Sequence, residues 1–190
     1  AVDLSYSNSA STTRGATGVY STAMGNGTEA SGNYSTAMGK NTTASASYSV
    51  AMGYLTTASG SQSTAIGRST LSSGVYSTAM GNGTEASGTG STTMGYGTTA
   101  GGDYSTAMGL TTTASGSYST AMGRNTTASD YGSLVIGQYN LLGSTVTSNA
   151  TSFDTANTAF VIGNGTGTGG RSDAFKVMFN GDATVSNDLT

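Results

Sequence analysis

The side chains that carry most enzymatic chemistry are missing from this chain of 190 residues. It contains no His and no Cys, so it offers no Ser-His-Asp or Cys-His nucleophilic site, no usual zinc ligands and no disulfide. Its nine acidic residues do not cluster into the paired carboxylates that a glycoside hydrolase needs. We therefore expect that the chain is not an enzyme and has no catalytic, cofactor or metal site.

Two glycine- and aspartate-containing patterns resemble ligand motifs only in part. The glycines of segment 165–170 match the dinucleotide fingerprint, but a period-two strand pattern follows them, so no helix N-terminus is expected to receive a phosphate. Calcium-binding β-solenoid repeats place a carboxylate in every coil, whereas the Asp residues here are too dispersed for that. The sequence favours neither ligand.

The charge pattern also limits the partners. The net charge is −3, and the six basic residues are scattered along the sequence, so no nucleic-acid or anionic-lipid partner is expected. Apolar runs such as the tripeptide 134–136 are short, so we expect no membrane insertion. The N-terminus has no signal core, and we expect the chain to be a processed product or a segment of a longer protein.

An apolar residue recurs every fourteen positions along the chain, and each copy is followed by Gly. These residues are Met24, Met38, Met52, Ile66, Met80, Met94, Met108, Met122 and Ile136. A small residue precedes most of them, and a second small-residue column runs from Ala16 to Ala128 at the same period. Tyr6–Ala10 is interpreted as a degenerate first copy of the same unit.

Each repeat unit predicts two short strands and two turns. Large and small side chains alternate over Tyr20–Met24, a period-two pattern typical of a strand, and segments such as 25–27 carry turn residues. Coils of fourteen residues stacked in register give parallel ladders about 4.8 Å apart. We therefore predict an all-β fold, a β-roll or β-solenoid, over residues 1–137.

Two arrangements of the coil are open. If Ala23 faces Ala30 across the roll, the Met24-to-Ile136 column lies outside as an apolar stripe, which is longer than soluble monomers usually leave exposed. We prefer this arrangement and expect the stripe to be buried between associating rods. The alternative turns Met inward and gives a thin, self-sufficient solenoid.

The repeated Ser-Thr-Ala-Met-Gly unit, with Ala-Ser-Gly seven residues later and Ala65-Ile66-Gly67 in one copy, resembles the head repeats of trimeric autotransporter adhesins of the YadA-like kind. The resemblance covers Tyr6 to Gly137. It implies a left-handed, homotrimeric parallel β-roll on a bacterial surface. Such repeats also occur in tail fibres of phages and related injection machines.

Residues 138–190 predict a different, irregular neck or shaft segment. The fourteen-residue period is lost after Gly137, and Phe160–Gly163 returns 26 residues after the last copy. Further on, Phe175–Phe179 alternates, Asn180-Gly181 is expected to form a two-residue type I′ turn, and Ala183–Val185 forms the return strand of a β-hairpin. This pattern is similar to shaft segments of phage tail fibres and tailspikes.

Three surface columns are candidates for contacts. A Tyr column is interpreted as stacked packing, with an aromatic ladder for glycans as the alternative; its members are Tyr6, Tyr20, Tyr34, Tyr48, Tyr76, Tyr104 and Tyr118. A Thr column that includes Thr43 and Thr57 leaves ice binding open, although Glu29 and Glu85 interrupt it. The position after each Met-Gly pair varies freely and is expected to face solvent. Tyr54, Tyr96, Arg68, Arg124 and, from a neighbouring turn, Tyr131 are the possible surface contacts.

Three functional hypotheses result. The preferred one is a non-enzymatic, homotrimeric extracellular fibre segment that acts in adhesion, as a bacterial adhesin head, or as a rigid spacer that presents a binding surface to a host-cell, matrix or glycan receptor. The second is a phage-like tail-fibre segment for host attachment. The third is a monomeric ice- or glycan-binding solenoid.

Overall fold

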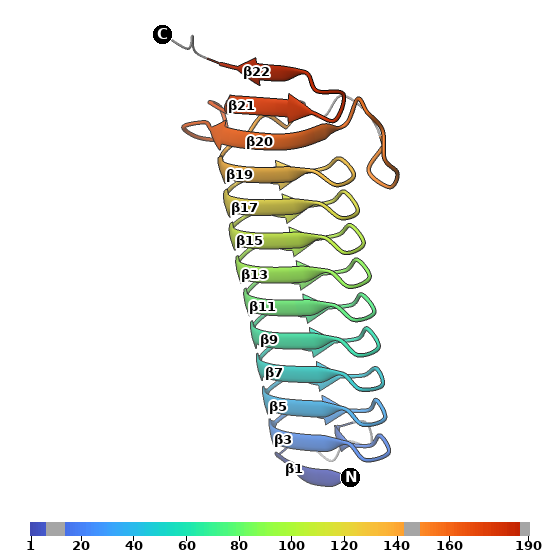
Figure 1. Cartoon of the computed structure of the whole chain (residues 1–190). Coiled ribbons are helices and arrows are strands. Elements are labelled where there is room, and N and C mark those ends of the chain that lie inside the picture. The colour runs from blue at the N-terminus through green and yellow to red at the C-terminus, as the bar shows by residue number, and fades with distance from the viewer. Residues whose placement is uncertain (7–13, 143–148, 187–190) are drawn as a thin grey trace.

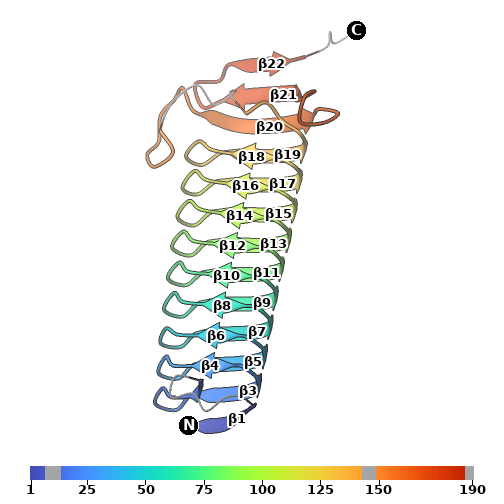
Figure 2. The same ribbon diagram turned by 180° about the vertical axis from the view of Figure 1, so that it is seen from behind.

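The chain forms a straight β-solenoid, described here over residues 1–6, 14–142 and 149–186 of a computed structural model. Figure 1 shows one long coil stack, with the N-terminal strand at one end and the C-terminal hairpin at the other. The described residues contain strands and turns but no helix. Followed along the chain in Figures 1 and 2, the coils wind left-handed. The predicted all-β parallel roll is thus confirmed.

Each regular coil contributes one five-residue strand and one two-residue strand, and each set forms its own sheet. The long strands are β1 (Val2–Tyr6), β3 (Thr22–Asn26), β5 (Thr36–Lys40), β7 (Val50–Tyr54), β9 (Thr64–Arg68), β11 (Thr78–Asn82), β13 (Thr92–Tyr96), β15 (Thr106–Leu110), β17 (Thr120–Arg124) and β19 (Leu134–Gln138). The short strands are β2 (Gly15–Ala16), β4 (Glu29–Ala30), β6 (Thr43–Ala44), β8 (Thr57–Ala58), β10 (Leu71–Ser72), β12 (Glu85–Ala86), β14 (Thr99–Ala100), β16 (Thr113–Ala114) and β18 (Thr127–Ala128). The last strands are β20 (Thr158–Asn164), β21 (Asp173–Met178) and β22 (Ala183–Val185).

Over the regular coils, from β3 to β19 and from β2 to β18, the two sheets are parallel ladders in register with the fourteen-residue repeat. In the 13-stranded sheet Met24 lies beside Met38, and Gly25 lies beside Gly39. In the 9-stranded sheet Ala30 lies beside Ala44. Every equivalent side chain therefore forms a straight column along the rod.

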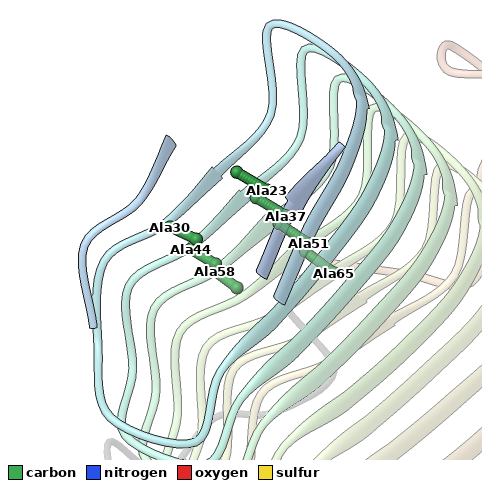
Figure 3. Packing of buried hydrophobic residues seen from close by; sticks show 7 residues of the cluster. All are labelled: Ala23, Ala30, Ala37, Ala44, Ala51, Ala58 and Ala65. Atoms are coloured by element: carbon green, nitrogen blue, oxygen red, sulfur yellow. The ribbon is translucent and has the colours of Figure 1, made fainter. Parts of the chain in front are cut away.

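The interior is made of alanine rather than large apolar residues. Ala23 and its equivalents in the long strands face Ala30 and its equivalents in the short strands, as Figure 3 shows, and these alanines are completely buried. Because both columns consist almost entirely of alanine, with Thr93 and Val135 as the larger residues in one and Ser72 in the other, the two sheets approach closely. The arrangement with Ala inside is confirmed, and the alternative with Met inside the roll is wrong.

A buried column of threonines completes the interior at the turn after each long strand. Its members, Thr28, Thr42, Thr56, Thr70, Thr84, Thr98, Thr112 and Thr126, are at most 2% exposed. Their hydroxyl groups have no hydrogen-bond partner among the described residues. In contrast, several inward serines donate to the carbonyl three residues earlier, as Ser21 does to Gly18 at 2.7 Å. We therefore expect these buried threonine hydroxyls to lower the stability of the rod.

We expect Thr84→Val to stabilise the rod by about 1 kcal/mol, because it removes a buried hydroxyl without a partner and keeps the shape of the side chain. Thr99→Val is the control, since Thr99 points outward on β14 and should change stability by less than about 0.5 kcal/mol. The thermal unfolding midpoint measures both. A lower midpoint for Thr84→Val would show that its hydroxyl is satisfied.

The two edges of the roll differ in shape. The narrow edge contains the last residue of each long strand and the two turn residues after it, that is 26–28, 40–42 and so on every fourteen residues to 138–140. The broad edge contains the longer turns after the short strands, such as 31–35 and 45–49. The broad loops project on the right in Figure 1 and on the left in Figure 2, opposite the narrow edge.

The N-terminal strand corrects one sequence prediction. β1 lies beside β3, with Leu4 next to Met24 and Tyr6 next to Asn26. Tyr6 therefore occupies the end of a long strand and does not belong to the Tyr column. The expected copy at Tyr6–Ala10 is wrong at Tyr6, and its remaining positions lie outside the described residues.

At the C-terminal end, the stack continues beyond the last regular coil. β20 lies parallel to β19 with Ile162 beside Ile136, so the 26-residue interval keeps the ladder in register. Asp130 fixes this junction, because its buried carboxylate accepts the backbone N–H of Thr158 at 2.7 Å. The motif at 160–163 is therefore a further rung of the same sheet.

The predicted C-terminal hairpin is present, but its turn differs from the prediction. β21 and β22 pair antiparallel, with Val177 beside Ala183. The Met178 N–H donates to Asp182, and the Gly181 N–H donates to Met178, so three residues separate the paired ends. Of the turn residues only Gly181 has a positive φ, of 93°. A type I′ turn needs two such residues, so the two-residue turn is wrong.

Candidate interaction surfaces

The outer face of the 13-stranded sheet carries the predicted apolar stripe. All nine residues from Met24 to Ile136 point outward from the long strands, and most are half-buried by their neighbours in the column. Met24 and Ile66 are the most exposed of them, at 37% and 36%. Leu4, which lies beside Met24, and Ile162, which lies beside Ile136, extend the stripe at its two ends. Leu4 could not be recognised from the sequence as part of this stripe, because no Gly follows it and its spacing to Met24 is irregular.

Four of the five predicted contact residues lie in one column at the narrow edge. Tyr54, Arg68, Tyr96 and Arg124 end successive or alternate long strands, and all four are exposed. Tyr131 does not join them. It lies at the broad edge, where its ring packs edge-on against Tyr118 at a centroid distance of 5.2 Å.

The narrow edge also gathers basic residues that are far apart in the sequence. Lys40 Nζ and the Arg68 guanidinium lie 5.8 and 6.0 Å from the centroid of the Tyr54 ring, one coil to either side. The Arg14 guanidinium lies beside Gly27, at the first turn of the same edge. The basic residues are scattered along the sequence, as expected. The expectation that they form no group in the folded protein is wrong, because several of them lie along this edge.

The upper end of the narrow edge repeats this arrangement. Arg124 and Arg171 lie 5.4 and 5.8 Å from the ring centroid of Tyr139, which is buried. Arg171 also donates to the backbone carbonyls of Asn125 and Asn140 at 3.1 and 3.0 Å. Sequence spacing gave no sign of this contact, because Arg171 reaches the edge from the loop between β20 and β21.

The Tyr column forms an exposed ladder along the broad edge. Neighbouring rings stack with centroid distances of 5.2 Å for Tyr20 and Tyr34 and 4.9 Å for Tyr34 and Tyr48. A second stack joins Tyr104 and Tyr118 at 5.3 Å. The six tyrosines from Tyr20 to Tyr118 are 50–70% exposed, and each has a φ of 55–60°. Since most ring faces within a stack cover one another, the ladder presents mainly ring edges and hydroxyl groups.

The remaining candidate patterns form no compact site. The Thr column that includes Thr43 and Thr57 lies half-buried on the outer face of the 9-stranded sheet, where Leu71 and two glutamates interrupt it. The glycines of 165–170 form a loop between strands β20 and β21, with a bridge from Gly167 to Gly170. Over the described ranges, there is no group of three acidic residues that could hold a metal ion, and no helix suited to crossing a membrane.

The fold and its outward columns define the class of this protein, which is a parallel β-solenoid built from one fourteen-residue unit. A family model described as the YadA head domain repeat matches residues 16–111 and 114–140 in overlapping copies that start fourteen residues apart from 16 to 86. The chain therefore belongs to the YadA head-domain repeat family. No curated protein matches it.

Proposed function

We propose that this chain is a non-enzymatic segment of an extracellular homotrimeric fibre, in which three parallel rods bury their apolar stripes against one another and present their edges to a surface that the fibre contacts. The family membership supports this assignment, because YadA-type head repeats belong to trimeric surface adhesins. The fibre acts in adhesion, and the rod serves as its rigid spacer.

The outward column from Met24 to Ile136 is the observation that carries the proposal. It places one apolar side chain on the same face of each regular coil, about 4.8 Å apart, over the whole length of the stack. A straight apolar line is buried best by a second straight line, and parallel copies of the same rod supply it in the same register. Flexible Met side chains fill the irregular space between such rods.

Sedimentation of the purified chain at micromolar concentration should give three times 18.7 kDa. Placing two carboxylates in the stripe, with Met80→Asp and Met94→Asp, should shift the protein to monomers, because buried unpaired charges oppose association.

The matched control places the same two charges at the narrow edge, with Asn82→Asp and Tyr96→Asp two residues further along each strand. These variants should remain trimers. A stable, folded wild-type monomer, or a trimer that tolerates both charges in the stripe, would contradict the proposal.

A further inference from the structure

We propose that the narrow edge is a binding surface for a linear anionic polysaccharide. The inference rests on the proposed function, since it names the chemical class of the surface that the fibre contacts. It depends on three features of the edge, which are its charge, the availability of that charge, and the side chains between the charges.

The narrow edge concentrates positive charge on an acidic protein. The chain has a net charge of −3 and only six basic residues. Five of these lie along the narrow edge, namely Arg14, Lys40, Arg68, Arg124 and Arg171. The sixth, Lys176, is in β21. Charge of one sign along a straight edge is complementary to a chain of the opposite sign.

Three exposed cations of this edge contact aromatic rings and form no ion pair with a carboxylate of the described residues. Lys40 and Arg68 lie on either side of Tyr54, and Arg124 lies over Tyr139. Among the described residues, no carboxylate forms an ion pair with these three side chains, and all three are exposed. Glu29 and Glu85 lie on the outer face of the other sheet, in β4 and β12. The positive charges are therefore free to meet an anionic partner.

The other side chains of the column suit sugar hydroxyl groups. Besides the cations and one apolar residue, Leu110, the position at the end of the long strands β3 to β19 holds two tyrosines and three amides, which are Tyr54, Tyr96, Asn26, Asn82 and Gln138. Amides donate and accept hydrogen bonds, and Tyr offers both a ring and a hydroxyl group. Since coil packing accepts many residue types here, this composition is not imposed by the fold.

A polysaccharide fits this edge better than a nucleic acid. Lys40 and Arg68, on either side of the Tyr54 ring, compete with a base for its faces, whereas single-stranded nucleic-acid sites rely on open aromatic faces. Lys40 and Arg68 are two coils apart, and Arg124 is four coils further, so the charge density is low.

The test measures binding of the intact chain to four immobilised polymers. These are alginate, which carries carboxylates, heparin, which carries sulfates, neutral dextran, and oligothymidylate as an anion that is not a saccharide. The edge variant combines Lys40→Gln, Arg68→Gln and Arg124→Gln. The control combines Asn33→Asp, Ser47→Asp and Ser61→Asp at the broad edge, and it lowers the net charge by the same three units.

We expect alginate and heparin to bind, with affinity that falls as salt is added. The edge variant should bind them about tenfold more weakly, because each exposed charge pair contributes a factor of about two to three. The control should stay within about twofold of the wild type. Equal losses in both variants, equal binding of dextran, or tighter binding of oligothymidylate would overturn the proposal.

Sedimentation of the same samples separates this proposal from the proposed function. A trimer that binds no anionic polysaccharide contradicts the inference alone. A monomer whose narrow edge still binds alginate or heparin contradicts the trimeric fibre and leaves the inference standing.

Discussion

Gly81→Val is expected to destabilise the rod by more than about 4 kcal/mol, which is the range of the most damaging single substitutions. Gly81 has a φ of +129°, a conformation that disfavours any residue with a Cβ. A Cβ at this position would lie 2.0 Å from the carbonyl oxygen of Gly95 in the next coil. Both atoms belong to paired strands, so relief requires the separation of β11 from β13. Thermal unfolding followed by circular dichroism measures the loss.

Two nearby positions provide controls. Gly83 also has a positive φ, of +64°, but nothing lies within 4 Å of a Cβ built there. Gly83→Asn should be tolerated, because Asn41 and Asn125 occupy the equivalent turns with φ of 53°. Asn82→Val should change stability by less than about 1 kcal/mol, since this position faces outward at the edge. If Gly81→Val melts at the same temperature as these variants, the close contact between coils is not present.

Deleting one complete repeat, Tyr76–Thr89, should leave a folded trimer that is shorter by about 4.8 Å. The deletion brings β9 next to β13, and the fourteen-residue register places Thr64 beside Thr92 and Gly67 beside Gly95. Each coil contacts mainly its neighbours, so the remaining coils keep their packing. Small-angle scattering measures the length of the particle, and sedimentation measures its oligomeric state.

A deletion of half a repeat is the matched control. Removing Gly83–Thr89 takes out one narrow turn, β12 and the first three residues of the next broad turn, so the end of β11 is joined to Gly90, two residues before β13. The 9-stranded sheet is then interrupted, and the buried column that contains Ala79 and Thr93 loses Ala86 of β12 on the opposite side. We expect loss of the cooperative unfolding transition. Folding of this variant as a regular rod, or collapse of the full-repeat deletion, would show that the repeat is not the unit of packing.

The regular part of the fold could be predicted because one spacing determines it. With fourteen residues between successive Met-Gly pairs, the strands, the parallel register and the columns all result from the same number. The choice of Ala23 for the interior depended on a local property and on the family resemblance. The β-branched Thr22 beside it belongs on a packed surface, and the resemblance to YadA-like head repeats favours the same arrangement.

The features that could not be predicted depend on contacts between segments without a common period. Tyr6 falls in the Tyr column by counting, but β1 pairs with β3 at an offset of twenty residues. Arg171 joins Arg124 through a loop that no sequence spacing relates to the narrow edge. The turn at Asn180-Gly181 has three residues because the Met178 N–H pairs with Asp182. In each case the coil geometry, rather than a motif, decides which residues meet.

The direction of the ladder hydrogen bonds has a mechanical consequence. In both sheets these bonds join one coil to the next, so they run along the axis of the rod. When the two ends of the chain are pulled apart, the hydrogen bonds between the outermost coil and its neighbour break first, and the next coil follows. The sheets therefore unzip coil by coil and are not sheared as a whole. Each released coil supplies fourteen residues, or on the order of 45 Å of extended chain. Under tension the rod would lengthen in equal steps and absorb work gradually before it unfolds completely.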